Sequence, residues 1–392
     1  MDNQTVENSG LGRFSPDIVH LTREVYGSRA ESILETLPKP VYKYYVRCNT
    51  LKISPENLLT RLIDKDLDVT QHLAVPEALG IRVEGPFEVE QSGRRVVVDR
   101  LTSESVLQGA NVYAPGIIDC GSLSLGDRVT VVSEMNDILG IGEATMNSND
   151  ILTFRKGLAV KLRERRYKSP QIRDLPEFTE GLLYPQSLAA MITSRVLDPK
   201  KGELIVDLNC SPGGKLSHFC QLTENTGQSV GIDRNGEKVD RARRTLTRLG
   251  CMNVTVVVHD SRYVPEDMPE LKADRVLVDP PCSALGLRPK IFDSKTRTKI
   301  LALADYQKQF LKAAAKIVKP GGVVVYSVCT FTLQECEEVV EFGERECGLH
   351  TVEQTPFIGS KDFRKNSSST NSCQRFDPIS DEIGYFIAKF ER

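Results

Sequence analysis

The sequence predicts an α/β chain whose C-terminal half forms a parallel β-sheet with helices on both faces, preceded by a small α+β unit and a β barrel. From residue 181 onward, short apolar runs alternate with amphipathic helical segments, which is typical of a parallel sheet covered on both sides. Over 96–168, short apolar runs are separated by Gly, Asp, Ser and Asn, which predicts strands joined by turns. We therefore expect three units, at 1–95, 96–168 and 169–392.

The first unit is expected to mix helices and strands. Apolar residues recur at helical spacings over 16–37, which predicts one or two helices. A strand is expected at 44–51 (YYVRCNTL), followed by a helix (NLLTRLIDK) after the Ser-Pro pair at 54–55, because proline favours the first helical turn. The runs LDVTQH and LGIRVEG predict two further strands, so the unit ends near Phe87.

The second unit is expected to contain strands and turns without a clear helix. Its segments VVVDR, VYAPGII, DRVTVVS and DILGIGEAT lie between turn-forming residues, which predicts a compact barrel ending near Tyr167. The stretch PQIRDLP at 170–176 is interpreted as a linker, since prolines flank its polar residues.

The third unit alternates strands and helices. Its expected helices are LAAMITSRVL, KLSHFCQLT, EKVDRARRTLTRLG and YQKQFLKAAAKIV. Its expected strands are ELIVDLN, QSVGID, NVTVVVHD, DRVLVDP and GGVVVYSV, with GYFIAKF at 384–390 as the last. The polar run NSSSTNS at 366–372 is expected to be a flexible loop.

Composition favours a cytoplasmic protein without a membrane partner or a metal. No apolar run approaches the roughly 18–20 residues that span a bilayer, and the N-terminus MDNQTVENSGLGRF is too polar for a secretion signal. The 10 cysteines include no CxxC pair and do not cluster with the 5 histidines, which argues against a metal site or a disulfide framework. Most cysteines are therefore expected to be reduced, buried apolar residues.

Basic residues gather in three stretches although the net charge is only −2. Residues 155–173 carry eight Lys/Arg against one Glu, residues 234–248 six against two acidic residues, and residues 288–299 five against one. Basic patches on a near-neutral chain fit a protein that holds phosphates at chosen places. For any single stretch, a solvated helix face is the simpler interpretation.

The strand ends of the third unit predict a nucleotide-type cofactor site, because ligands of such sheets lie beyond the carboxyl ends of the strands. The first strand ends at Asp207 and continues as NCSPGGKLSH. Gly213 and Gly214 allow a tight turn and close approach of a ligand. The following helix start offers free N–H groups, and Lys215 adds a cation. A plain strand-to-helix turn would use the same residues.

Acidic residues at the next two strand ends strengthen this interpretation. Asp233 ends the second strand, where a carboxylate can accept both hydrogen bonds of a ribose diol. Asp260 ends the third strand and can meet an adenine amino group. Nicotinamide, flavin and adenosyl cofactors all make these demands, so hydride transfer and methyl transfer both stay open at this point.

Two cysteines at the later strand ends favour methyl transfer. DPPCSALGLRP (279–289) follows the fourth strand and YSVCTFTLQE (326–335) closes the fifth. If these strands are neighbours, about 4.8 Å apart, Cys282 and Cys329 face one pocket together with Asp279. Packing and a disulfide are the alternative explanations for such a pair.

A thiol, a carboxylate and a methyl donor together suit methylation of cytosine at carbon 5, which is a poor nucleophile. A thiolate that adds to carbon 6 makes the ring an enamine, and carbon 5 can then attack a methyl sulfonium. Loss of the carbon-5 proton lets the thiol leave. Asp279 can hydrogen-bond nitrogen 3 and the exocyclic amine of the cytosine, and the second thiol can help to expel the product.

At these motifs the chain resembles the Nop/Sun (RsmB/Nop/Sun) family of RNA cytosine-5 methyltransferases. The resemblance covers SPGGK, GIDRN, VDPPCSALGLRP, GGVVVYSVCT and YFIAKF, and YYVRCNTLK is similar to the family's small N-terminal unit. It implies a Rossmann-like class I methyltransferase sheet, an RRM-like N-terminal unit and S-adenosyl-L-methionine as cofactor. It also implies that Cys329 is the nucleophile and that Cys282 is needed for product release.

The resemblance further implies which positions touch cofactor or substrate. They are Asn209, Cys210, Ser211, Pro212, Gly213, Gly214, Lys215, Asp233, Lys238, Asp260 and Asp279. Asn209 stands where the family commonly has Cys, and Val328 replaces the usual Thr before the nucleophile. Neither change removes a group that the mechanism needs.

Residues 96–168 resemble a PUA domain through VVVDR, QGANVYAPGI, GDRVTVV, GIGEA and RKGLAV. Gly109, Ala110 and Gly116 match the turn that lets RNA backbone approach closely. A PUA module is characteristic of the family's tRNA-specific branch (member six), and this chain is similar to its archaeal type. That implies methylation of an acceptor-stem cytosine next to the CCA end, expected at position 72, with the PUA domain holding the CCA end.

A tRNA is therefore the expected partner of a protein that we expect to be monomeric. The candidate RNA contacts are Arg155, Lys156, Lys161, Arg163, Arg165, Arg166 and Arg288. Two alternatives stay open: the same chemistry on ribosomal RNA, and an RNA-binding protein that has lost catalysis. Retention of Cys282, Cys329 and Asp279 together argues against the second.

Overall fold

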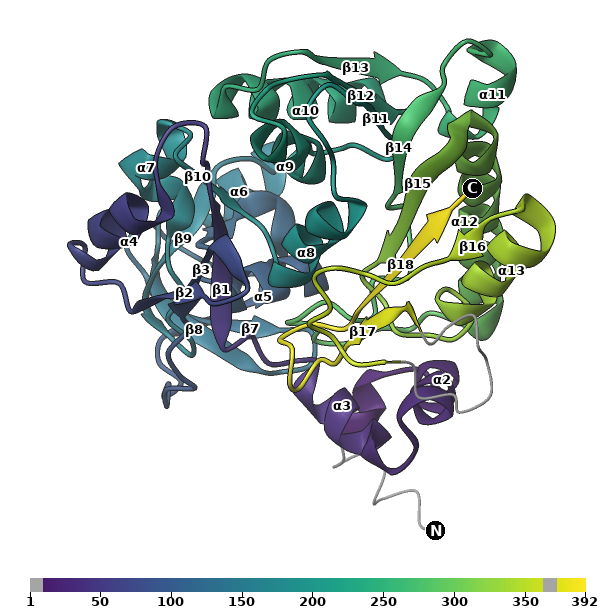
Figure 1. Cartoon of the computed structure of the whole chain (residues 1–392). Helices are drawn as coiled ribbons and strands as arrows, with labels where there is room; N and C mark the ends of the chain where they lie inside the picture. The colour runs from purple at the N-terminus through teal and green to yellow at the C-terminus, as the bar shows by residue number, and fades with distance from the viewer. Residues whose placement is uncertain (1–9, 362–371) are drawn as a thin grey trace.

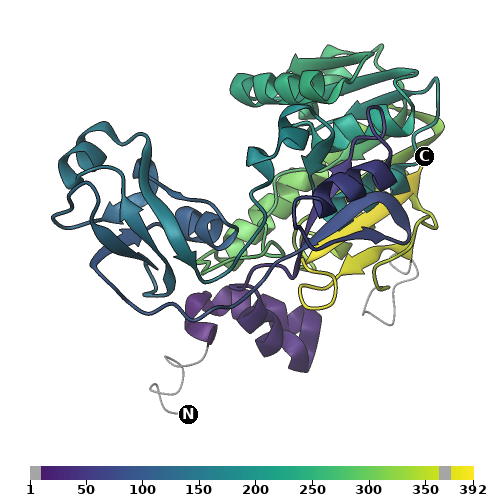
Figure 2. The ribbon, with the colours of Figure 1, turned by 90° about the vertical axis from the view of Figure 1, so that its left-hand side faces the viewer.

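The computed structural model describes residues 10–361 and 372–392, so the expected loop at 366–372 lies outside the described residues except for Ser372. The described chain forms three β-sheets (Figure 1). The six-stranded sheet forms a lobe beside the larger part of the chain (Figure 2). No helix among the described residues is long and apolar enough to cross a membrane.

Two helices at the N-terminus pack on the C-terminal half of the chain. The 3-10 helix η1 (Gly10–Arg13) precedes α2 (Pro16–Tyr26), and α3 (Ala30–Thr36) follows the 3-10 turn η2 (Gly27–Arg29). Ser15 caps α2, since its hydroxyl accepts a hydrogen bond from Ile18 N at 3.3 Å. The buried faces of both helices share an apolar cluster that includes Leu285, Ile300 and Phe331. The prediction of one or two helices over 16–37 is confirmed, and the structure has two.

The small antiparallel sheet has the strand order β10-β1-β3-β2. Its elements are β1 (Lys43–Cys48), α4 (Pro55–Ile63), β2 (Val69–His72), β3 (Val75–Arg82) and β10 (Leu183–Pro185). β1 ends before the predicted boundary because Asn49 turns toward the rest of the chain, where its amide donates to Gly181 O and Leu249 O at 2.7 and 2.8 Å. β10 comes from beyond the six-stranded lobe in sequence and joins β1, so this sheet is built from two distant segments.

The six-stranded lobe has the order β5-β9-β8-β7-β4-β6. Its strands are β4 (Arg94–Val98), β5 (Val112–Tyr113), β6 (Ile117–Asp119), β7 (Arg128–Ser133), β8 (Ile138–Ala144) and β9 (Leu158–Arg165). The prediction of a unit without helices was wrong, because α5 (Arg100–Leu107) and α6 (Ser148–Phe154) lie within it. Both are short and start at side-chain caps, Asp99 and Asn147, a local signal that apolar periodicity does not report. A 3-10 turn, η3 (Ala114–Gly116), links β5 to β6.

The eight-stranded sheet has the order β13-β12-β11-β14-β15-β18-β16, with β17 paired to β18. Its strands are β11 (Leu204–Asp207), β12 (Gln228–Asp233), β13 (Val254–Val258), β14 (Ala273–Val278), β15 (Val318–Val328), β16 (His350–Thr351), β17 (Gln374–Phe376) and β18 (Tyr385–Glu391). Strands β11 to β15 are parallel, and β18 runs antiparallel to β15. The expected neighbour relation of β14 and β15 is therefore confirmed.

Helices cover both faces of this sheet (Figure 1). One apolar layer packs under α8 (Leu188–Leu197), α9 (Gly214–Leu222) and α10 (Gly236–Leu249). The other packs under α12 (Arg297–Ile317) and α13 (Glu337–Cys347), the latter not predicted from the sequence. Consecutive residues of one strand enter opposite layers, as a pleated strand requires. Short elements complete the chain: η4 (Ile172–Asp174), α7 (Pro176–Thr179), η5 (Ser261–Tyr263) and α11 (Val264–Asp267).

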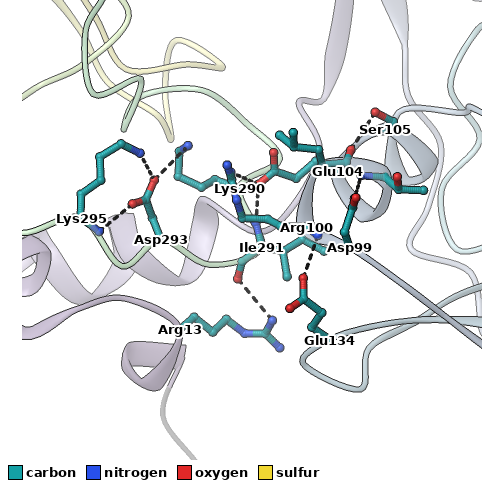
Figure 3. Close-up of polar contacts among 12 residues, drawn as sticks. Arg13, Asp99, Arg100, Glu104, Ser105, Glu134, Lys290, Ile291, Asp293 and Lys295 are labelled. Carbon is teal, nitrogen blue, oxygen red and sulfur yellow. Dashed lines mark hydrogen bonds and ion pairs between the residues drawn. The ribbon is translucent and has the colours of Figure 1, made fainter. Parts of the chain in front are cut away.

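A docking segment, residues 288–295, connects the six-stranded lobe to the C-terminal half (Figure 3). Ile291 is 1% exposed and belongs to the apolar core of the lobe. Its backbone N donates to Glu104 Oε1 at 3.3 Å. The buried carboxylate of Asp293 accepts from Lys295 Nζ at 2.6 Å. Because this segment continues directly from the DPPCSALGL motif, the lobe is fixed to the same loop that carries Cys282.

Candidate active site

The carboxyl ends of the parallel strands converge on a pocket of about 300 Å³. Several residues predicted to form the site line it together: Asn209, Ser211, Asp233, Lys238, Asp260, Asp279, Cys282 and Cys329. A neighbouring cavity of about 170 Å³ shares Asn209, Ser211 and Asp279 with the pocket, and its wall adds Cys210, Pro212, Gly214 and Lys215. The predicted residues thus surround two adjoining spaces at one edge of the sheet.

The two predicted cysteines lie side by side. Cys282 follows β14, Cys329 follows β15, and their Sγ atoms are 3.3 Å apart as free thiols. The pKa of Cys282 is raised well above its usual value by its contact with Cys329 and by burial. Cys282 therefore stays protonated, and its S–H can donate to Cys329 Sγ.

Backbone and buried side-chain contacts hold the two cysteine loops together. Gly286 N donates to Cys329 O at 3.1 Å, and Ser283 Oγ lies 2.7 Å from Thr330 Oγ1. The fully buried Glu335 accepts from Ser283 N at 2.7 Å and from Gln307 Nε2 at 2.9 Å. No sequence periodicity marks Glu335, because its partners come from three segments.

The carboxylate of Asp279 is oriented by three side chains. Its Oδ2 accepts from Lys215 Nζ at 2.5 Å, and its Oδ1 accepts from Ser327 Oγ at 2.9 Å and Tyr385 OH at 3.4 Å. Burial acts to lower the pKa of Lys215, but the charge of Asp279 outweighs it and raises that pKa, so the lysine is a cation. The sequence did not indicate a role for Ser327 on β15 or for Tyr385 on β18, a strand that reaches the site through its pairing with β15.

The backbone conformation and contacts within the protein require glycine at both positions of the turn, Gly213 and Gly214. Gly213 has φ 97° and caps α9, a conformation that L side chains rarely adopt. A Cβ at Gly214 would come within 2.8 Å of the Tyr184 ring. Arg47, fully buried at the end of β1, donates to Gly214 O at 2.6 Å and Ser217 Oγ at 2.6 Å. The YYVRCNT motif therefore acts on this turn from a separate sheet, which the sequence did not reveal.

The acceptors around the pocket fit S-adenosylmethionine. Asn209 Oδ1 is buried without a hydrogen-bond partner among the described residues, so it can accept from a ligand ammonium. Asp233 uses only Oδ1 for Asn235 N, at 3.0 Å, which leaves Oδ2 for a ribose hydroxyl. Asp260 lines the pocket while both its oxygens accept from Arg262, at 2.9 and 2.6 Å. A carboxylate oxygen can accept a second bond.

Asp207 is a further buried acid at this edge. It is 2% exposed, and burial raises its pKa from 3.8 to about 7, although Asn209 N donates to its Oδ1 at 3.0 Å. The sequence placed Asp207 at a strand end without assigning it to the site. It lines the second cavity together with Lys215.

The predicted RNA contacts on the lobe fall into two groups. Most of the basic side chains are exposed: Arg155, Lys156, Lys161, Arg163 and Arg166. Arg165 is half-buried and donates to Ala110 O at 2.7 Å. Gly109 and Gly116, where RNA backbone was expected to approach closely, are approached by side chains of the protein itself. A Cβ at Gly109 would lie 2.6 Å from Gln171 Nε2, and a Cβ at Gly116 would lie 1.8 Å from Thr102 Oγ1.

The expectation that Arg288 contacts RNA is corrected by the structure. Arg288 is 5% exposed, and its guanidinium donates to four backbone carbonyls. Two of them belong to the segment after α3, Lys39 and Pro40, and two to the loop before β18, Pro378 and Glu382. Its role is structural, since the buried guanidinium is held by main-chain acceptors.

Comparison with known families matches each part of the chain. Residues 194–391 match a family described as 16S rRNA methyltransferase RsmB/F. Residues 94–165 match a PUA domain, and residues 18–90 match the ferredoxin-like domain of RsmF/B-like methyltransferases. The predicted fold class, a Rossmann-like methyltransferase sheet with a small α+β unit and a PUA barrel, is confirmed.

Full-length relatives show the same arrangement. A tRNA (cytosine(72)-C(5))-methyltransferase from Pyrococcus horikoshii is 37% identical over 388 residues, covering 97% of this chain and 98% of its own. The human tRNA (cytosine(72)-C(5))-methyltransferase NSUN6 is 29% identical, over 92% of this chain and 90% of its own. The crystal structure of NSun6 from P. horikoshii with SFG has a TM-score of 0.89 at 38% identity, over 97% of this chain and 99% of that one.

Proposed function

The chain belongs to the RsmB/Nop/Sun family of S-adenosylmethionine-dependent RNA cytosine-5 methyltransferases, and from this premise we propose that it methylates tRNA. The target is a cytosine of the acceptor stem next to the CCA end, at position 72. The single observation that carries the chemistry is the 3.3 Å approach of Cys282 Sγ and Cys329 Sγ beside Asp279. The relatives that span nearly the whole chain support the substrate.

In this mechanism the Cys329 thiolate adds to carbon 6 of the cytosine, and the electron pair moves to carbon 5. S-adenosylmethionine supplies the methyl group when bound beside Asn209, Asp233 and Asp260. Loss of the carbon-5 proton to solvent then restores the double bond between carbons 5 and 6 and expels Cys329 as its thiolate. The S–H of Cys282 can donate a hydrogen bond to the departing sulfur, 3.3 Å away, which favours release.

Asp279 orients the target base. Its carboxylate is fixed by Lys215 and Ser327, so its remaining acceptor capacity can receive the exocyclic amine of cytosine. The neighbouring cation of Lys215 can stabilise the negative charge that develops on the ring as the thiolate adds. A uracil would present a carbonyl in place of the amine, and its oxygen would face the carboxylate. The site therefore favours cytosine.

The PUA lobe is proposed to bind the CCA end through its exposed basic residues. Extruding a base from within a stem costs a few kcal/mol, and extruding a base from the pair at the end of a stem costs less. A target beside the CCA end is therefore accessible. The monomeric state and cytoplasmic location stay predictions, and light scattering of the purified protein tests the first.

A covalent trap and a sequencing assay test the function. With tRNA and methyl donor, Cys282→Ala should accumulate a protein–RNA adduct on a denaturing gel, whereas Cys329→Ala should form none. Bisulfite sequencing of tRNA treated with wild-type enzyme should show a single new methylated cytosine at position 72. Methylation of ribosomal RNA fragments with tRNA left unmodified would refute the substrate, and absence of both adduct and transfer would refute the enzyme assignment.

A further inference from the structure

A basic groove lies beside the active site, and none of its arginines is among the individual RNA contacts predicted from the sequence. Its cavity of about 590 Å³ is lined by Phe178, Tyr184 and four arginines, and no acidic side chain lines it. We call these arginines the arginine groove: Arg173, Arg241, Arg244 and Arg248.

Helical geometry places three of these arginines on one face of α10. Arg241, Arg244 and Arg248 are spaced i, i+3 and i+7, which aligns them along the helix. At about 1.5 Å of rise per residue, the row is ~10 Å long. Arg243 points elsewhere, since it donates to Asp240 Oδ1 at 3.2 Å and to Val256 O at 2.8 Å.

The positive charge of this face is not balanced within the described chain. Arg173, Arg241 and Arg244 are exposed and have no hydrogen-bond or ion-pair partner in residues 10–361 and 372–392. Arg248 differs, because it donates to the carbonyl oxygens of Phe178 and Leu183 and lies 4.1 Å from the Phe178 ring centroid. Like charges at helical spacing destabilise a helix, so folding does not explain Arg241 and Arg244.

The groove is continuous with the active site. Tyr184, Pro185 and Pro212 line both the groove and the second cavity. That cavity reaches Lys215 and Asp279, the residues proposed to hold the target base. A strand whose base enters the pocket beside Asp279 can therefore continue into the groove.

We propose that the arginine groove binds the sugar–phosphate backbone of the RNA strand that carries the target cytosine. This inference rests on the proposed function, because it takes RNA as the substrate. With one charge per ~3.4 Å of duplex axis on each strand, the ~10 Å row spans about three phosphates of a base-paired strand. Guanidinium groups suit phosphate oxygens, which they can contact in pairs. The contact is with backbone, so it holds the strand without reading its sequence.

Charge removal on the groove face tests this site. The test variant is the double substitution Arg241→Gln and Arg244→Gln, which keeps helix propensity. The matched control is Arg243→Gln combined with Lys201→Gln. The control residues are exposed basic side chains already paired with Asp240 and Glu224. Binding of tRNA is measured from low to high salt, and methyl transfer gives KM for tRNA and kcat.

The groove variant should weaken tRNA binding about ten-fold and lower the slope of log affinity against log salt by about 1–2, with kcat and cofactor affinity near wild type. The control should keep the wild-type slope. The variant carrying Arg241→Lys and Arg244→Lys should recover most of the affinity, which excludes misfolding. An unchanged slope and KM in a groove variant that melts at the wild-type temperature would overturn the inference. Failure of the proposed function is separate, because it would appear as no methyl transfer to tRNA by wild type.

Discussion

Asp207 makes the stability of the methyltransferase sheet depend on pH. The carboxyl group is 2% exposed, and burial raises its pKa from 3.8 to about 7. A folded-state pKa above the unfolded value means that the folded chain holds a proton which the unfolded chain has lost. The favourable contribution of the Asp207 carboxyl group to the free energy of unfolding is complete below about pH 4 and disappears as the pH rises through about 7. We predict that Asp207→Asn removes this dependence, because the amide cannot ionise.

The size of the effect follows from the two pKa values. Each unit of difference corresponds to about 1.4 kcal/mol, so the shift from 3.8 to about 7 gives about 4 kcal/mol in total. Most of this change falls between about pH 5 and pH 7.5. Over that range the free energy of unfolding of wild type should fall by roughly 2–3 kcal/mol relative to that of Asp207→Asn. The amide oxygen can still accept from Asn209 N, which now donates at 3.0 Å. The variant should therefore fold normally.

Urea unfolding between pH 5 and pH 8 measures this difference. It is followed by circular dichroism without cofactor, because a bound ligand would add its own stabilisation. Asp305→Asn serves as the control, since Asp305 lies on α12 with its side chain 71% exposed. Its stability should follow wild type at every pH. Parallel curves for wild type and Asp207→Asn across this range would refute the assignment of a buried, protonated Asp207.

Three further substitutions test the contacts that hold the site together. Lys215→Met removes the cation beside Asp279 and should lower kcat about 100-fold, measured by methyl transfer; a loss below three-fold would contradict that role. Ile291→Ala opens a cavity where the lobe meets the docking segment and should destabilise the lobe by about 2–5 kcal/mol. Thermal melts measure this change, and an unaltered melting curve would show that Ile291 does not anchor the lobe. Glu77→Gln removes the charge that pairs with Arg195 at 2.6 Å and should lower the free energy of unfolding, measured in urea, by about 3–5 kcal/mol. Glu77→Asp keeps the charge and should show a smaller loss.

Some features of the site could be predicted because they are local in the sequence. Asp233 is the last residue of β12, Cys329 directly follows β15, and Cys282 lies four residues beyond the end of β14. The carboxyl ends of parallel strands meet at one edge of the sheet, so a residue at the end of such a strand is predicted to line the pocket there. The helix α5 was missed because eight mostly polar residues carry too little apolar periodicity to mark a helix.

Other features depended on residues far apart in the chain. Arg288 lies in a basic stretch that predicts an RNA contact, yet its guanidinium donates to carbonyls almost 250 residues earlier and about 90 residues later. Arg47 reaches the glycine turn from another sheet, and Glu335 joins both cysteine loops.

The amino-acid sequence by itself determined the order of strands and helices, the residues at each strand end and, through them, the chemistry. Tertiary structure decided which charged side chains face solvent and which are buried as internal supports, and it revealed the unpaired arginines of α10. The physical reason is that exposure and pairing of a charge depend on what packs against it. That partner is set by the fold and not by neighbours in the chain.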